Sequence, residues 1–438
     1  NRQKPNRPID DIEANALLSG LTQNTPEAQF ITRGDRGVLA GQHTVHHSIP
    51  GIAITGPVDP VGAGDASTAM LAACGAIQLD QRSSAILANL SASVTVRKLN
   101  QTGTASETEL LDAARHLAYV YHPSLADDLR LAKTFGDSDI EIVDDSMVPV
   151  ISPESFPFKY AIFDHDGTIS TLRQGWETVM ESVMVRAITG NRFQSVERSI
   201  LQLVTGRVHE YIEQTTGIQT IAQMDGLVLL VHEFGLVSDN EKLDAWGYKR
   251  LYNDALMAMI NERIARLRRK ELDHDDFIIK GAVEFLQTLC DAAVSLLLFS
   301  GTDEADVMRE AELLGYAKYF DGGIYGAKPN SRADTKDEIL TSLLTSQVGT
   351  QIDAATLGGK VLVIGDGPVE LQLARRYGAV ALGIASNEQR RFGLNPSKRR
   401  RLIRAGAHIL TPDFSQARVL CDAVRQFRLG APVDPPRL

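Results

Sequence analysis

The sequence predicts an α/β protein whose larger part is a doubly wound parallel sheet, and three observations carry this prediction. Short apolar runs typical of buried strands alternate with helical patterns after about residue 158. Such alternation favours a parallel sheet with helices on both faces. Carboxylates follow directly after two of these runs, where open α/β sheets place their ligands. A long helical insertion, about 173–280, separates the first run from the second.

Three blocks follow one another along the chain. The expected core strands of the larger block are 160–163, 295–299, 361–364 and 379–384. The first block, residues 1–115, alternates strands with helices; its strands are expected at 28–32 and 38–40 and its helices at 66–76 and 83–99. Residues 116–157 contain Asp-rich and Pro-containing sequence, so we expect a linker there. The predicted domains are 1–115 and 158–428, the second with a core (158–172 and 281–428) and a helical insertion.

The composition limits the kinds of partner. The 438 residues are 43% hydrophobic and 23% charged, and the formal net charge is −10. This charge disfavours nucleic acid or an anionic membrane surface as the main partner, and no apolar run approaches the length of a membrane span. We interpret the basic run 398–401 as the solvated face of a helix. The three cysteines lie far apart, which fits a reducing, cytoplasmic compartment.

Two carboxylates, Asp164 and Asp166, follow the first core strand, with Gly167 directly after them. Such a pair can hold Mg²⁺, a hard ion that prefers oxygen ligands. One carboxylate can also attack phosphorus while its neighbour transfers protons. Taken alone, the pattern also fits an acidic strand end followed by a turn, so its interpretation depends on the rest of the block.

Three further elements supply groups that phosphoryl transfer needs. Ser300 follows the second core strand, where its hydroxyl can bind a phosphate oxygen. Lys336 lies at a predicted helix start, and its ammonium could neutralise a phosphoryl group and the nucleophile. Asp366, with Glu370 nearby, follows the third core strand. Polar groups therefore follow three different strands of one predicted sheet.

Over residues 158–428 the chain resembles the haloacid dehalogenase (HAD) superfamily. Its four motifs are similar, in order, to 164–168, Ser300, Lys336 and Asp366 with Glu370. Lys328 is the alternative for the third motif, because many relatives have a Lys-Pro pair there, as this chain has at 328–329. We favour Lys336, which leads a helical pattern.

The resemblance implies a Mg²⁺-dependent phosphohydrolase with a Rossmann-like core and a helical cap. Asp164 is then the nucleophile, and Asp166 protonates the leaving oxygen and later activates water. Asp164, the backbone carbonyl of Asp166 and Asp366 would hold Mg²⁺. The insertion matches the position of the cap. Arg173 and its neighbours Trp176 and Glu177 could face the site, or they could be ordinary hinge and packing residues.

A second motif lies in the first block. Gly62, Ala63 and Gly64 precede Asp65 at a predicted helix start. Glycines there allow backbone N–H groups to converge on an anion, and Asp65 could take a proton from an attacking hydroxyl. A Gly-rich turn with a helix-capping Asp is the simpler interpretation of the motif by itself.

With the segment 31–38, this motif resembles the ribokinase-like (PfkB) carbohydrate kinases over residues 1–115, although Pro60 stands where those kinases usually have Thr. The resemblance makes Asp65 the base and 62–64 the anion hole. The residues near ATP are then Thr32, Gly34, Gly37 and Asn89. Such kinases carry a further N-terminal part with the sugar site. We therefore expect a fragment that binds ATP weakly and transfers no phosphate to sugars.

The leading hypothesis is a Mg²⁺-dependent phosphatase that acts on a small phosphoester, such as a sugar phosphate, and is fused to a truncated sugar kinase. A second hypothesis makes the kinase-like part a nucleotide-sensing module that controls the phosphatase. A third is a phosphotransferase or phosphomutase, which can use the same first motif. The expected partners are a small phosphorylated metabolite and, as one way of completing an acceptor site, a second copy of the chain in a homodimer.

Overall fold

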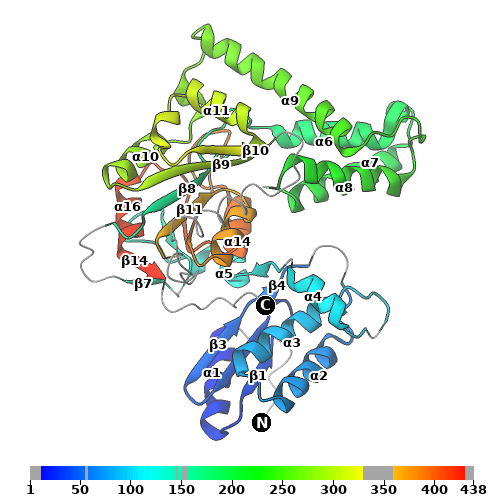
Figure 1. Ribbon diagram of the computed structural model, residues 1–438, viewed down its shortest axis with the longest axis vertical. Helices are drawn as coiled ribbons and strands as arrows, with labels where there is room; N and C mark the ends of the chain where they lie inside the picture. Colours follow the sequence, from blue (N-terminus) through cyan, green and yellow to red (C-terminus); the bar gives the residue numbers. More distant parts are fainter. Residues whose placement is uncertain are drawn as a thin grey trace. The chain divides into compact units, whose positions relative to one another are not determined.

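The structure, a computed structural model, describes residues 11–54, 58–101, 103–115, 117–144, 147–149, 156–216, 218–328 and 359–429 (Figure 1). The chain forms two compact units. One consists mainly of the residues up to Ser124, and the other mainly of residues from Leu125 onward. None of the helices in these described ranges combines the length and the apolar character that a bilayer span requires.

The first unit pairs a small antiparallel sheet with helices. Its sheet has the order β1-β2-β3, and its strands are β1 (Gln29–Thr32), β2 (Val38–Gln42), β3 (Val45–Ile49), and the separate pair β4 (Gly51–Ile52) and β5 (Tyr119–Val120). Its helices are α1 (Asp11–Asn24), α2 (Ala63–Ala76), α3 (Gln81–Thr95) and α4 (Glu107–Arg115). Helix α3 is buried along most of its length, and Ala85 and Ile86 pack against Val38 and Ile49 of the sheet. The strands and helices predicted for this block correspond to β1, β2, α2 and α3.

The second unit is built on a seven-stranded sheet in the order β10-β9-β8-β11-β12-β13-β6. The strands are β6 (Glu141–Ile142), β8 (Tyr160–Asp164), β9 (Ser295–Asp303), β10 (Ile324–Ala327), β11 (Val361–Gly365), β12 (Val380–Ile384) and β13 (Ile409–Thr411). The pairings from β10 to β13 are parallel, whereas β6 runs antiparallel to β13. The predicted doubly wound parallel sheet is confirmed, and the four predicted core strands correspond to β8, β9, β11 and β12.

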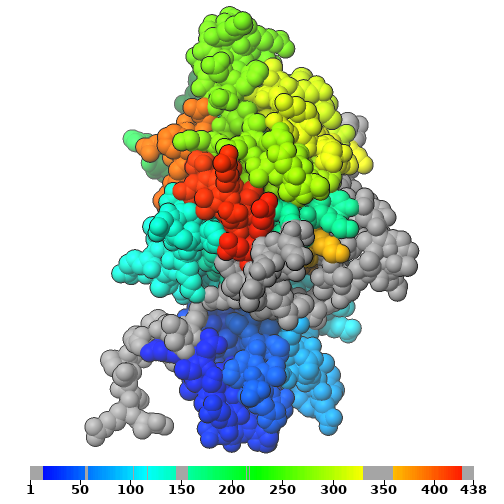
Figure 2. Space-filling model, turned by 90° about the vertical axis from the view of Figure 1, so that its left-hand side faces the viewer, coloured from blue at the N-terminus to red at the C-terminus, as the bar shows by residue number. Residues whose placement is uncertain are grey.

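Helices cover both faces of this sheet. They are α10 (Ala282–Asp291), α11 (Glu304–Leu313), α14 (Pro368–Arg376), α15 (Pro396–Arg404) and α16 (Ala417–Gln426). Helices α10 and α16 lie together on one face, and α14 lies on the other (Figure 1). Figure 2 shows α16, in red, against the yellow-green α10, and an ion pair of 3.6 Å joins Arg418 to Glu284 across them.

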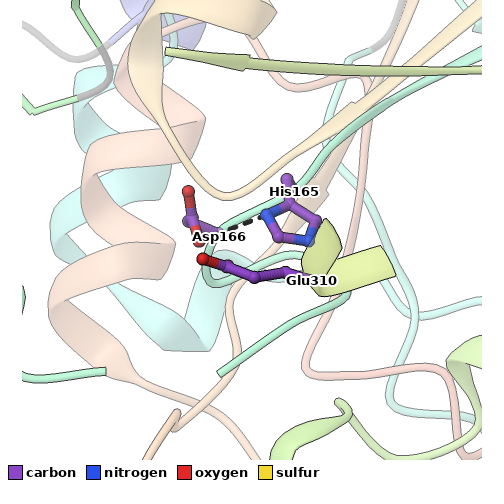
Figure 3. A group of neighbouring side chains, drawn as sticks. All are labelled: His165, Asp166 and Glu310. Atoms are coloured by element: carbon purple, nitrogen blue, oxygen red, sulfur yellow. Dashed lines mark ion pairs between the residues drawn. The ribbon is translucent and has the colours of Figure 1, made fainter. Parts of the chain in front are cut away.

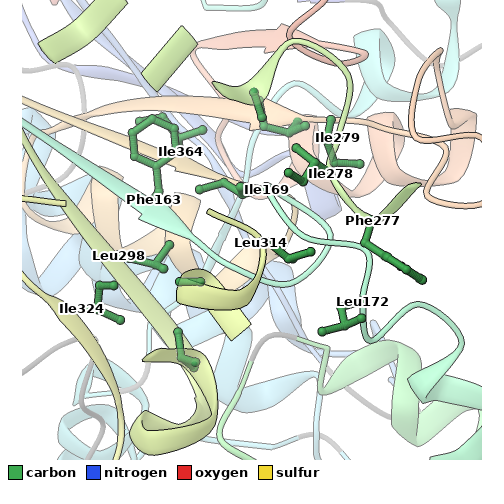
Figure 4. Close-up of a cluster of buried hydrophobic side chains, with 14 of the residues drawn as sticks. Phe163, Ile169, Leu172, Phe277, Ile278, Ile279, Leu298, Leu314, Ile324 and Ile364 are labelled. Carbon is green, nitrogen blue, oxygen red and sulfur yellow. The ribbon is translucent and has the colours of Figure 1, made fainter. Parts of the chain in front are cut away.

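The central strands are buried because both of their faces are covered. Every residue of β11, and every residue of β8 after Tyr160, is buried, which accounts for their near-continuous apolar sequence. Figure 4 shows Phe163 and Ile364 from β8 and β11 beside Leu298 and Ile324 from β9 and β10. Burial of such side chains contributes roughly 1.5–3 kcal/mol each. Packing in this cluster therefore stabilises the alignment of the four strands relative to one another.

Strand register aligns the carboxyl ends of three strands. Phe163 of β8 is the partner of both Leu298 in β9 and Ile364 in β11. The residues that follow these three positions therefore emerge at one edge of the sheet. This edge is where the predicted phosphohydrolase motifs lie in the sequence.

The predicted helical insertion is present. It contains α6 (Trp176–Thr189), α7 (Arg198–Gln214), α8 (Thr220–Phe234) and α9 (Ala245–Arg268). Helix α9 packs on α6 and α8. Its buried side chains Tyr252, Leu256 and Ile260 belong to the same apolar cluster as Met184 of α6 and Leu227 of α8. We refer to these four helices as the cap.

The predicted linker 116–157 is in large part folded structure, which corrects the sequence-based boundary. Among its described residues, β5 pairs with β4 in the first unit, and β6 extends the sheet of the second unit. The segment also contains α5 (Pro123–Asp127) and β7 (Met147–Pro149), and β7 pairs with β14 (Phe427–Leu429). The polar residues of this segment suggested a linker because their partners lie far away in the sequence. Glu141 of β6, for example, is buried against Arg399.

The basic run 398–401 is not the solvated helix face that the sequence suggested. Arg399 is 3% exposed and donates two hydrogen bonds to Glu141, at 2.7 and 2.8 Å. It also donates to the carbonyl groups of Leu125 and Ala126. Only Arg400 fits the prediction, since its side chain is 59% exposed. The Arg399–Glu141 pair therefore fastens α15 to the edge strand β6.

Removing one partner of this buried pair should destabilise the second unit. In Glu141→Gln the guanidinium of Arg399 stays buried without its counter-charge, which costs about 3 kcal/mol or more. The exposed pair Arg269–Glu271 provides the control, and Glu271→Gln should cost less than about 1 kcal/mol. Urea unfolding followed by circular dichroism measures both, and equal midpoints for the two variants would contradict the assigned role of Glu141.

Candidate active site

A pocket opens at the carboxyl ends of β8, β9 and β11, and residues of the cap complete its wall. Strand β8 ends in Asp164, and the loop after it contributes Asp166. Strand β9 contributes Ser300, and the loop after β11 contributes Asp366 and leads into α14, which contributes Glu370. The structure thus brings together five residues that the sequence singled out in three separate segments.

The loop after β8 is folded back on itself. The backbone N–H groups of Ile169 and Ser170 both donate to the carbonyl of His165, and that of Gly167 donates to Ser170. Gly167 has φ +78°, a left-handed conformation that glycine adopts without steric cost. Ile169 and Leu172 are fully buried and anchor the loop in the core (Figure 4). The turn therefore holds Asp166 beside Asp164 at the strand end.

Asp164 and Asp366 approach each other across Thr168. The Thr168 hydroxyl lies 3.5 Å from Oδ2 of Asp164 and 3.4 Å from Oδ1 of Asp366. Asp366 packs directly on Gly167, where a Cβ atom would overlap its Oδ2. Carboxylate oxygens gathered at this spacing are a donor set that fits a hard divalent cation such as Mg²⁺. Asp164, Asp366 and the backbone carbonyl of Asp166 are the groups of this loop that could hold one.

Asp166 has hydroxyl groups on one side. The hydroxyls of Ser300 and Thr302 donate to its Oδ2, at 3.3 and 3.1 Å. On the other side, Nδ1 of His165 and Nε of Arg173 lie 3.3 and 3.8 Å from its Oδ1. Burial by itself would raise the pKa of Asp166, but the charges of His165 and Arg173 outweigh burial and hold that pKa well below its usual range. The surroundings of Asp166 in the free protein therefore favour its ionised form.

His165, Asp166 and Glu310 lie close together, as Figure 3 shows, with ligand atoms within 4.8 Å of one another. This group has the composition of a metal site, which the sequence did not suggest. Arg173, however, donates two hydrogen bonds to Glu310, at 3.1 and 2.6 Å. Nε2 of His165 lies 2.6 Å from the hydroxyl of Tyr316. Because the guanidinium already supplies the positive charge, we interpret the group as a buried ion-pair network that supports Asp166.

The structure does not decide between Lys336 and Lys328 as the third-motif lysine. It places a different lysine, Lys398, in the pocket. Lys336 lies outside the described residues, and Lys328 is exposed and does not line the pocket. Lys398 of α15, which the sequence analysis missed, lies in the pocket. Its Nζ is 2.5 Å from Asp366 and 2.6 Å from Glu388. Burial opposes its charge, but the two carboxylates raise the pKa of Lys398 above its ordinary value.

The cap and the segment that leads into it contribute polar and charged side chains to the pocket. Arg173, Trp176 and Glu177, left between two interpretations by the sequence, all line it. Lys249 of α9 also lines the pocket, and its Nζ bonds to Asp303 at the end of β9, at 2.7 Å. This bond joins the cap to the end of β9 in the core.

In the first unit, the Gly-rich motif forms the beginning of α2. Gly62 has φ +83° and caps the helix, while Ala63, Gly64 and Asp65 form its first turn. Asp65 and Gly64 are exposed. The first turn of a helix has backbone N–H groups without partners inside the helix, and such a geometry can receive an anion. The Gly-rich motif is therefore the beginning of a helix, and the anion hole expected at 62–64 stays a prediction.

The other residues expected near ATP lie on different parts of the first unit. Thr32 ends β1 and is exposed, and Gly34 and Gly37, with φ +65° and +81°, bracket the turn to β2. Asn89 is 7% exposed, and its amide donates to the carbonyl of Pro50 at 2.7 Å. Asn89 thus braces the chain beside β3. Thr32 and Gly34 are exposed, whereas Gly37, like Asn89, is buried.

Family models match both parts of the chain. The model of the haloacid dehalogenase-like hydrolases matches residues 158–378, half of the chain, and that of the pfkB family carbohydrate kinases matches residues 4–109. The chain belongs to the haloacid dehalogenase-like hydrolases and carries a pfkB-type region before the hydrolase. No curated protein matches it.

Several solved structures are similar in part. A β-phosphoglucomutase from Clostridium difficile is 14% identical, with 59% of this chain and 92% of that chain covered and a TM-score of 0.38. A predicted phosphatase from Clostridium acetobutylicum is 16% identical, with coverages of 61% and 98% and a TM-score of 0.38. A predicted phosphoglycolate phosphatase from Haemophilus somnus 129pt is 12% identical, with coverages of 60% and 98% and a TM-score of 0.39.

The close packing of Asp366 on Gly167 gives a test of the site geometry. Gly167→Ala should lower phosphatase activity by about a hundredfold or more, because the added methyl displaces Asp366. Gly315→Ala is the control, since Gly315 has φ +81° but open space around its Cβ position, so it pays the backbone strain alone. Hydrolysis of p-nitrophenyl phosphate measures both. Equal activities would show that the contact with Asp366 is unimportant.

Proposed function

We propose that this protein is a Mg²⁺-dependent phosphatase that hydrolyses a small phosphoester through a phosphorylated Asp164. The observation that supports this most strongly is the meeting of Asp164, Asp166, Ser300 and Asp366 in one pocket. Two carboxylates with different surroundings allow one to act as nucleophile and the other as acid and base. The cap wall limits the space and the water around the reacting groups.

In the first step, a carboxylate oxygen of Asp164 attacks phosphorus, and the bond between phosphorus and the leaving oxygen breaks. Asp166 donates a proton to that oxygen. In the second step, Asp166 takes a proton from water, the water oxygen attacks phosphorus, and the carboxylate of Asp164 leaves. The hydroxyls of Ser300 and Thr302 keep the carboxylate of Asp166 in place for both transfers.

Asp166 needs a proton for the first step although its pKa is low in the free protein. A bound phosphate brings negative charge next to it, which favours the protonated carboxyl. After the leaving group has departed, His165 and Arg173 favour the carboxylate, which is the form that accepts a proton from water. Mg²⁺, held by Asp164 and Asp366, would offset the charge of the phosphoryl oxygens.

The proposed substrate is a small, hydroxylated phosphoester such as a sugar phosphate. Gln223, Lys249 and Asn253 of the cap line the pocket together with Thr216. Amides, an ammonium and a hydroxyl are groups that hydrogen-bond to sugar hydroxyls.

Two other functions use the same features. A phosphotransferase or phosphomutase would pass the phosphate from Asp164 to a second sugar, so phosphate would appear on that acceptor instead of in solution. A nucleotide-sensing role for the first unit would use the exposed start of α2 as a phosphate site. ATP would then change the rate of hydrolysis without being consumed.

Asp164→Asn should lower hydrolysis of p-nitrophenyl phosphate by at least about three orders of magnitude, because an amide is a poor nucleophile towards phosphorus. Asp291→Asn, which changes a carboxylate on α10 outside the pocket, is the matched control and should keep wild-type activity. Circular dichroism checks that both variants are folded. Retention of a tenth or more of the activity in Asp164→Asn would refute the assignment.

Removing divalent cations should abolish hydrolysis, since the pocket collects carboxylates and no described cysteine lines it. Dialysis against EDTA, followed by stepwise addition of Mg²⁺ or Zn²⁺, measures this. We expect Mg²⁺ to restore activity, because hard oxygen donors suit it. Full turnover in EDTA, or restoration by Zn²⁺ alone, would exclude the proposed role of Mg²⁺.

A further inference from the structure

The two carboxylate oxygens of Asp166 are contacted by different parts of the chain. Its Oδ2 accepts hydrogen bonds from the hydroxyls of Ser300 and Thr302, which belong to β9. Its Oδ1 lies 3.3 Å from Nδ1 of His165 and 3.8 Å from Nε of Arg173. Figure 3 shows the first of these contacts as a dashed line between Asp166 and the imidazole ring. The orientation of this carboxylate therefore depends on His165 as well as on β9.

The contacts on the Oδ1 side are less well formed than those on the Oδ2 side. Within the described part of the chain, neither Oδ1 of Asp166 nor Nδ1 of His165 has a hydrogen-bond partner of good geometry. Arg173 is the more distant of the two neighbours of Oδ1, and its short bonds, at 3.1 and 2.6 Å, go to Glu310. The place of the imidazole ring therefore decides how far the Asp166 carboxylate can turn on this side.

The ring of His165 is held at its other nitrogen. Nε2 lies 2.6 Å from the hydroxyl of Tyr316, which is a hydrogen-bond distance. Both side chains are fully buried, so a ring that lost this bond would keep an unpaired polar nitrogen in the core. A hydrogen bond at one nitrogen of an imidazole orients the ring, and with it the other nitrogen. Tyr316 thus sets the place of Nδ1 beside Asp166.

Tyr316 has a defined position of its own. Its ring packs edge-on against Phe320, with centroids 6.4 Å apart, and its backbone N–H donates to the carbonyl of Ala311 in α11. The side chain belongs to the apolar cluster of the parallel sheet. Neither Tyr316 nor His165 lines the pocket. An effect of the Tyr316 hydroxyl on catalysis must therefore pass through other residues.

We propose that Tyr316 is a positioning residue for proton transfer, which acts through His165 to hold the carboxyl group of Asp166 within reach of the leaving oxygen. This inference rests on the proposed phosphatase function, in which Asp166 gives a proton to that oxygen and later takes one from water. Proton transfer requires hydrogen-bond reach between the two groups. A carboxyl group that turns away loses that reach although the pocket keeps its shape.

The effect of a misplaced Asp166 depends on the leaving group. Nitrophenolate is a weak base that departs with little help from a proton, whereas phenolate is a stronger base that needs this help. The ratio kcat/KM reports the steps up to the departure of the leaving group, because phosphorylation of Asp164 and this departure are one step. Loss of positioning should therefore lower kcat/KM selectively for phenyl phosphate, whereas general damage to the site lowers it for both substrates.

Tyr316→Phe removes only the hydroxyl, and Tyr325→Phe is the matched control. The hydroxyl of Tyr325 donates to the carbonyl of Gly322 at 2.9 Å, and Tyr325 does not line the pocket. In Tyr316→Phe we expect kcat/KM for phenyl phosphate to fall about tenfold or more, and kcat/KM for p-nitrophenyl phosphate to fall less than about threefold. Tyr325→Phe should leave both ratios within about twofold of wild type.

His165→Phe, which keeps a ring in the same space but removes both nitrogens, should show the same selective loss. It serves as the test if circular dichroism shows that Tyr316→Phe does not fold. Equal falls for the two substrates in Tyr316→Phe, or no fall for either, would overturn the positioning role and leave the phosphatase function intact. A wild-type protein that hydrolyses neither phosphoester would refute the phosphatase function, and this inference with it.

Discussion

The charge balance at the carboxyl edge of the parallel sheet is the constraint on which the rest of the hydrolase unit depends. Asp164, Asp166 and Asp366 are all held near one another, and carboxylates this close repel unless cations accompany them. Arg173 and His165 form ion pairs with Asp166, and Lys398 forms one with Asp366. Such buried charges are tolerated only when they are paired. The cations are therefore as necessary to the site as the carboxylates.

Arg173 and Lys398 are each held by a contact outside the reacting groups. Glu310 of α11 clamps Arg173, and Asn395 fixes the turn that carries Lys398. The buried Arg399–Glu141 pair ties the same helix to β6. The active site thus depends on α11, α15 and an edge strand as well as on the strands that carry the motifs. Substitutions that break those contacts should alter the active site by displacing Arg173 or Lys398.

The parts of the fold that the sequence predicted are those with a local signal. The buried strands β8 and β11 have near-continuous apolar runs, and the carboxylates after them follow directly in the chain, so both strand and site could be inferred. The burial of Arg399 and Glu141 could not be predicted, because charged residues are usually exposed and these two are distant in the sequence. A polar segment between two domains then looks like a linker although it contains β6.

Lys398 illustrates the same limit within the site. A run of cations on a helix is usually a solvated face, and only the packing of α15 shows which members point inward. The i, i+3 spacing of Lys398 and Arg401 was the available hint that two of them share a side. Asn89 is the opposite case, since a residue expected near a ligand is instead a buried brace for the chain beside β3.

The account rests most directly on Asp164 as the group that becomes phosphorylated. Its clearest test is to quench the protein with acid during turnover of a phosphoester in Mg²⁺ and to locate the phosphate by peptide mass spectrometry. The account predicts phosphate on Asp164, and none there in the Asp164→Asn variant. Turnover with no phosphorylated peptide under conditions that preserve acyl phosphates, or with phosphate on Asp166, would contradict it.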